Sequence, residues 1–159
     1  MSTQAPYRLG DILANAITHG VGAILALIGS VLLIVRAAHS GAAHDGAWLV
    51  TSCSIYATTL CLVYLCSTLY HSLVRTGARH VFLVLDHAAI YLLIAGSYTP
   101  MCLITLRGPV GYTILGVEYA LAAVGIACTA YWKSAPDWGA QLVMLTAWAS
   151  AIAPSWTCR

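Results

Sequence analysis

The feature that most constrains this fold is a series of five long apolar runs separated by short polar turns. As a helix rising about 1.5 Å per residue, each run can cross a hydrocarbon core of about 30 Å. Strands cannot replace these helices, because an open sheet edge in lipid leaves backbone groups unpaired and barrel strands are shorter. The sequence therefore predicts an all-α, polytopic transmembrane helix bundle. The runs cover, approximately, Ile12–Val35, Ala47–His71, Val81–Leu106, Val110–Trp132 and Trp138–Trp156.

Composition supports the membrane class and excludes others. Of the 159 residues, 60% are hydrophobic and only 8% are charged, too few to cover a soluble domain of this size. The net charge of +2 is small and the basic residues do not cluster, so no nucleic-acid partner is expected. The six cysteines form no CxxC pair, and those within the apolar runs are expected to pack as small side chains. No linker divides the chain, so residues 1–159 are expected to form a single integral-membrane domain.

The basic residues of the turns set the expected orientation. With the N-terminus in the cytoplasm, four basic residues lie inside and three lie outside. The positive-inside bias therefore favours a cytoplasmic N-terminus. The inside residues are Arg8, Arg75, Arg79 and Lys133, and the outside residues are Arg36, Arg107 and Arg159.

Polar side chains gather at one end of this expected bundle. Because successive spans run in opposite directions, the start of the first, the end of the second and the start of the third share one membrane face. His19 lies near the start of the first span, Ser67 and His71 lie at the end of the second, and Asp86 lies near the start of the third. A carboxylate within a span is costly unless paired, so Asp86 is expected to face the bundle and to have a partner. The candidate partners are His71, His19, a helix-end amide, a bound cation, Arg79 and His80.

The residues alone leave two interpretations of this polar end. In the first, His71 binds zinc, for which imidazole is a good ligand, and Asp86 holds a metal-bound water as general base. Ser67, one turn before His71, then steadies the imidazole or binds substrate. In the second, His71 is an interfacial histidine and Asp86 is half of a buried ion pair. One histidine and one aspartate do not define a metal site by themselves.

Two polar features lie away from this end. Glu118 is alone in the fourth run, where it is expected to pair with Arg107 or to be protonated. The segment Ser97-Tyr98-Thr99-Pro100 interrupts the third run. Proline within a span frees a carbonyl and predicts a kink, and neighbouring hydroxyls can satisfy the freed group.

Three motifs in register carry a resemblance to a known family. They are Asn15-x-x-Thr18-His19-Gly20, Ser67-x-x-Tyr70-His71, and Leu85-Asp86-His87-x-x-Ile90-Tyr91 continuing to Ala95-Gly96-Ser97-Tyr98-Thr99-Pro100. From Asp11 to about Trp148 the chain resembles the hemolysin III family, the bacterial branch of the progestin and adipoQ receptor superfamily. The resemblance implies a seven-span bundle in the inner cell membrane, with a zinc ion near the cytoplasmic side.

The resemblance also implies roles for three residues. His71 matches the zinc-binding histidine that ends the second span, Asp86 matches an aspartate on the metal-bound water, and Ser67 matches a nearby serine. The superfamily is similar to alkaline ceramidases, which suggests a zinc-dependent membrane hydrolase acting on a lipid amide. A membrane lipid is accordingly the expected substrate or ligand. The alternatives are a lipid-sensing receptor or regulatory membrane protein, and a membrane-active cytolysin.

The five runs fall short of the seven spans that the resemblance implies. After Trp148 the sequence contains no span with the paired histidines that complete the family's zinc site. We therefore expect the chain to be truncated by two spans and two zinc ligands, and to be inactive unless another residue (His19 or His87) or another subunit supplies them. A water-filled pore is disfavoured, because the second, fourth and fifth runs are apolar through their middles.

Overall fold

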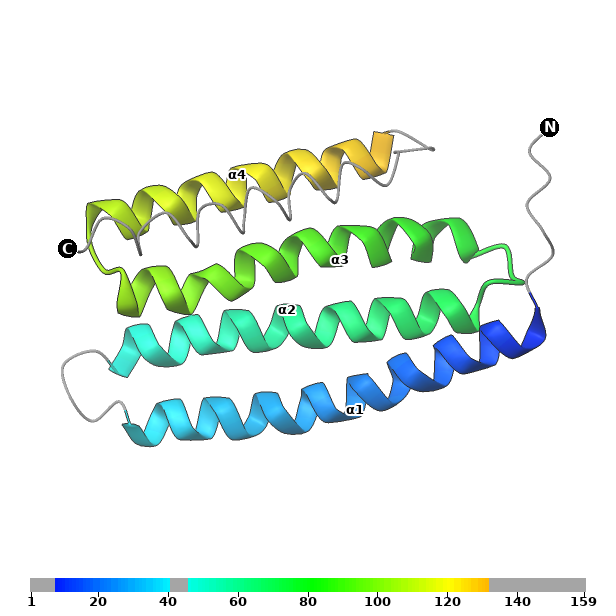
Figure 1. The fold of residues 1–159 in the computed structure, drawn as a ribbon, viewed down its shortest axis with the longest axis horizontal. Coiled ribbons are helices and arrows are strands. Elements are labelled where there is room, and N and C mark those ends of the chain that lie inside the picture. Colours follow the sequence, from blue (N-terminus) through cyan, green and yellow to red (C-terminus); the bar gives the residue numbers. More distant parts are fainter. Residues whose placement is uncertain (1–7, 41–45, 132–159) are drawn as a thin grey trace.

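The chain folds as a row of long antiparallel helices in a computed structural model, which describes residues 8–40 and 46–131 (Figure 1). The helices are α1 (Leu9–Ser40), α2 (Gly46–Ser72), α3 (Arg79–Pro100) and α4 (Pro109–Tyr131), and a π-helical segment (Met101–Thr105) extends α3. Within these residues four helical segments are long and apolar enough to cross a membrane. The prediction of an all-α membrane protein is therefore confirmed.

The predicted spans agree closely with the observed helices. The first helix differs most, because α1 continues beyond Val35 to Ser40. The added residues include two alanines, which are strong helix formers. The fifth predicted span, Trp138–Trp156, lies outside the described residues. The single domain and the cytoplasmic N-terminus stay predictions.

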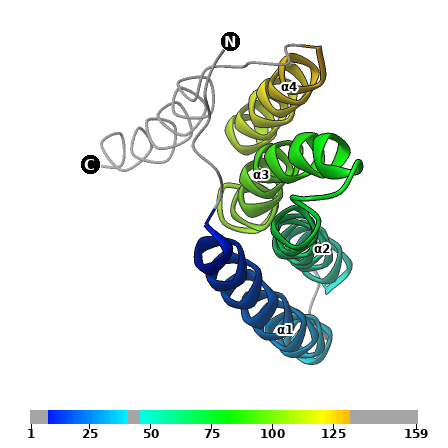
Figure 2. The same cartoon turned by 90° about the vertical axis from the view of Figure 1, so that its right-hand side faces the viewer.

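Each described helix contacts only its neighbours in the sequence. α1 packs on α2, α2 on α3 and α3 on α4, and α1 contacts neither α3 nor α4. Viewed along the helices, the four follow an arc (Figure 2). Large aliphatic side chains are exposed along α1, as expected of a surface that faces lipid.

Small residues allow these helices to approach closely. A Cβ atom on Gly22 of α1 would lie 2.5 Å from Cε1 of Tyr64 on α2. A Cβ atom on Gly125 of α4 would lie 2.5 Å from Cε1 of Tyr91 on α3. In both places an aromatic ring covers a helix backbone that lacks a side chain. Membrane helices use small residues in this way to gain van der Waals contact.

The predicted interruption of the third span is a change of helix type. Pro100 lacks a backbone N–H, and the next five residues, Met101–Thr105, are π-helical. The N–H of Leu106 donates to the carbonyl of Met101 at 2.9 Å, five residues back. The Thr99 hydroxyl donates to the Ala95 carbonyl at 3.0 Å, so a hydroxyl before the proline does bond to the helix backbone.

Candidate metal centre

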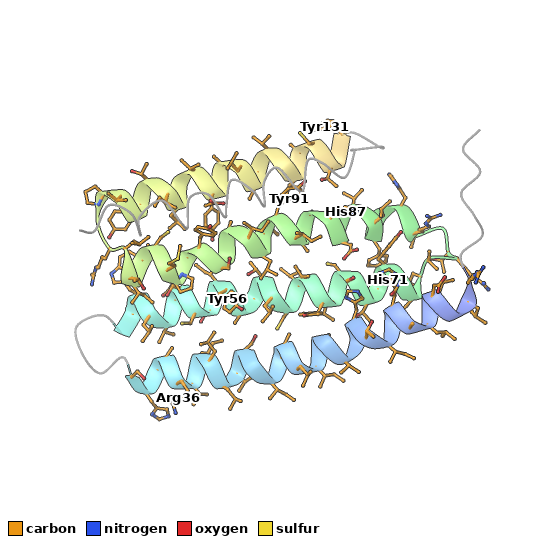
Figure 3. The ribbon with its side chains drawn as sticks, in the orientation of Figure 1. Arg36, Tyr56, His71, His87, Tyr91 and Tyr131 are labelled. Carbon is orange, nitrogen blue, oxygen red and sulfur yellow. The ribbon has the colours of Figure 1, made fainter. Side chains whose placement is uncertain are left out.

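Two histidines from different helices face each other at one end of the bundle. His71 is the second-to-last residue of α2, and His19 lies in the first third of the antiparallel α1. Their ring centres are 5.3 Å apart and their planes differ by 20°, so the imidazoles are stacked. Figure 3 shows His71 near this end of α2, whereas Arg36 lies at the other end of α1 (Figure 3).

Tyrosine rings flank this histidine pair. The ring of Tyr70 is 5.0 Å from that of His71, and the ring of Tyr64 is 6.3 Å from that of His19, centre to centre. Nδ1 of His19 is buried and has no hydrogen-bond partner. Aromatic rings therefore lie beside the histidine pair, and one of its ring nitrogens, Nδ1 of His19, makes no hydrogen bond.

The other two predicted site residues lie at the same end. Ser67 is on α2, one helical turn before His71, and only 4% of its surface is exposed. Asp86 of α3 is half-buried and lies within electrostatic range of His71 and of Cys66 on α2. Three helices thus contribute to this polar end, as the antiparallel order predicts.

The described residues do not form a closed metal site. Within residues 8–40 and 46–131, no group of three or more histidine, cysteine, aspartate or glutamate side chains could hold a metal ion. His87 of α3 is exposed, and its Nδ1 lies 2.8 Å from the carbonyl oxygen of Leu83, four residues earlier. One ring nitrogen of His87 is thereby occupied by its own helix.

A second buried polar group lies between α3 and α4. Glu118 of α4 is 2% exposed and lies within electrostatic range of Cys102, which is fully buried in the π-helical segment. Nearby along the same helices, the hydroxyls of Thr99 and Tyr119 are 3.0 Å apart. The polar end was identified from the sequence, but this hydroxyl pair was not, because its partners are twenty residues apart in different spans.

Comparison with known proteins gives the family. The model of the family described as "Haemolysin-III related" matches residues 11–158. The chain belongs to this family. It is 48% identical to hemolysin-3 of Bacillus cereus over 114 residues, covering 72% of this chain and 50% of that protein. It is 41% identical to a hemolysin-3 homolog of Bacillus subtilis over 120 residues, covering 76% and 54%.

A human protein matches the chain at lower sequence identity. This haemolysin III-related chain is 31% identical over 118 residues to the human monocyte to macrophage differentiation factor, covering 70% of this chain and 46% of that protein. No solved structure matches the chain. The chain spans about half the length of the curated relatives it matches.

Proposed function

We propose that this haemolysin III-related protein binds zinc where α2 ends, and that the site serves metal-assisted hydrolysis of a membrane lipid amide. The support is the convergence of an imidazole (His71), a carboxylate (Asp86) and a buried hydroxyl (Ser67) at one end of an otherwise apolar bundle. Polar and ionisable groups inside a membrane are costly and usually mark functional sites.

Each of the three side chains has its own role in this proposal. His71 is a metal ligand in its neutral form. A zinc ion held by His71 would lower the pKa of a bound water to about 7 and would polarise the substrate carbonyl. Asp86 would accept a hydrogen bond from that water and take up its proton. Ser67 donates a hydrogen bond to the imidazole or to the lipid amide.

The donors fit zinc in kind but are too few to close its coordination shell. Imidazole is a common zinc ligand, and a carboxylate commonly orients zinc-bound water. A catalytic zinc takes three protein ligands and a water, whereas the described residues contain no such group of three. The proposal therefore requires donors besides His71 and Asp86.

Turnover of a ceramide in lipid–detergent micelles tests the proposed hydrolase. Release of fatty acid should stop when a chelator removes zinc and should return when zinc is restored. Asp86→Asn should abolish turnover while zinc stays bound, because the amide keeps the shape of the carboxylate but cannot take up a proton. His87→Ala is the matched control, since this exposed histidine on the same helix has no role in the proposal.

Two other outcomes would reject the hydrolase. Binding of the lipid without turnover, in protein that contains zinc, would favour the lipid-sensing receptor. Leakage of liposomes that persists in His71→Ala would favour the cytolysin, which the name of the hemolysin-3 relatives suggests.

A further inference from the structure

A row of polar side chains runs along the first turns of α1 and leads to the histidine pair. Asp11, Asn15 and His19 are spaced four residues apart, and side chains at this spacing are neighbours on one face of a helix. His19, at the inner end of the row, stacks on His71 with the ring centres 5.3 Å apart. The row therefore connects the proposed site with the end of α1 that begins at Leu9.

The length of α1 places this row at the boundary of the membrane. A helix of 32 residues is about 48 Å long, so about 9 Å of it projects beyond each side of a hydrocarbon core of about 30 Å centred on it. Asn15 follows Leu9 by six residues, which is also about 9 Å along the helix. Asn15 therefore lies where the hydrocarbon core meets the lipid headgroups, and His19 lies one turn deeper.

The side chain of Asn15 is exposed, and its amide makes no hydrogen bond to the described part of the chain. Asp11 lies in the first turn of α1, where a carboxylate interacts favourably with the helix dipole. The Thr18 hydroxyl donates to the carbonyls of Ala14 and Asn15 at 2.8 and 3.1 Å. The helix itself thus accounts for Asp11 and Thr18, whereas the donor and acceptor of the Asn15 amide are available to a ligand.

We propose that Asn15 binds a headgroup hydroxyl next to the lipid amide, so that the substrate is an N-acyl lipid with a hydroxylated headgroup. A side-chain amide both donates and accepts hydrogen bonds, which matches the two capacities of a hydroxyl. With the lipid amide beside His71 and Asp86, the headgroup extends past His19 toward Asn15. This distance is one helical turn, about 6 Å, and a hydroxyl a few bonds from the amide covers it together with a hydrogen bond of about 3 Å. The inference rests on the proposed function and names its substrate class.

Competitive binding of two lipids to the purified protein in detergent micelles, followed by native mass spectrometry, tests this inference. The probes are ceramide and an amide lipid with chains of the same length but no headgroup hydroxyls. The unaltered protein should prefer ceramide by about 2- to 10-fold, the range expected of one hydrogen bond. Asn15→Leu should lose this preference. Thr18→Val is the matched control and should keep it, because the Thr18 hydroxyl donates to its own helix.

The possible failures can be told apart. An unaltered protein with no preference between the two lipids would overturn the inference without any variant. The same preference in Asn15→Leu as in the unaltered protein would overturn the role of Asn15, even if ceramide is hydrolysed. Loss of the preference in Thr18→Val as well would overturn it too, because the effect would then belong to the whole turn. The expected preference without hydrolysis would support Asn15 as a binding residue and would reject the hydrolase.

Discussion

Replacing Gly22 with alanine should force α1 away from α2 beside the histidine pair. The new Cβ atom would lie 2.5 Å from Cε1 and 2.6 Å from Cδ1 of Tyr64. Carbon atoms in favourable contact are about 3.5–4.0 Å apart, so the ring or the helix must move by about 1 Å. Overpacking of this kind costs about 1–3 kcal/mol.

Gly29→Ala is the matched control on the same helix. Nothing lies within 4 Å of a Cβ atom at Gly29. This substitution should therefore raise the free energy of unfolding by about 0.5–1 kcal/mol, because alanine is favoured over glycine within a helix. Because both variants replace glycine with alanine in the same helix, this gain is common to them, and they should differ in free energy of unfolding by the overpacking cost of about 1–3 kcal/mol. Unfolding in detergent, followed by loss of helical circular dichroism, measures this difference.

A rescue variant separates the steric effect from other causes. Tyr64→Ala removes the ring, so in that background Gly22→Ala should cost no more than Gly29→Ala. Equal stability of Gly22→Ala and Gly29→Ala in the otherwise unaltered protein would refute the close approach of α1 and α2. If the approach positions the histidines, Gly22→Ala should also weaken zinc binding, whereas Gly29→Ala should not.

Three further substitutions test the packing of the bundle. Gly125→Ala should destabilise the protein by about 1–3 kcal/mol relative to Gly116→Ala in the same unfolding assay. The ring of Tyr91 on α3 covers Gly125, whereas nothing lies within 4 Å of a Cβ atom at Gly116. Equal stability of the two variants would contradict the α3–α4 contact. Thr99→Val should lower the free energy of unfolding by about 0.6 kcal/mol, because the Thr99 hydroxyl loses its contact with the Tyr119 hydroxyl on α4. A double-mutant cycle with Tyr119→Phe should show that the two substitutions are coupled rather than additive. Ser67→Leu should cost about 1–3 kcal/mol because the site is buried, whereas Leu69→Ala, at an exposed position, should change stability little; a neutral Ser67→Leu would place Ser67 on the lipid surface.

Much of the architecture follows from the sequence because lipid allows few solutions. Each apolar run has to form a helix, and the alternation of direction brings Ser67, His71 and Asp86 to one end without any knowledge of packing. The four long helices in the described part of the chain agree with this reasoning to within a few residues at their ends.

The contact between His19 and His71 did not follow in the same way. The sequence offered His19 as one of several partners for Asp86 and, with His87, as a residue that could supply a missing zinc ligand, but not as a ring neighbour of His71. Antiparallel order fixes the depth of a residue in the membrane but not the rotation of a helix about its axis. That rotation depends on local contacts such as Gly22 against Tyr64. Likewise, Pro100 predicts an interruption, but whether the helix bends or adopts π-helical geometry is decided by its packing.

The metal content of the purified protein tests the central claim most directly. Protein in detergent should contain close to one zinc per chain, and His87→Ala should contain the same amount. His71→Ala should contain none, because the proposed site loses its main ligand. Zinc absent from the unaltered protein, or zinc retained by His71→Ala, would contradict the assignment of a metal site to this end of the bundle.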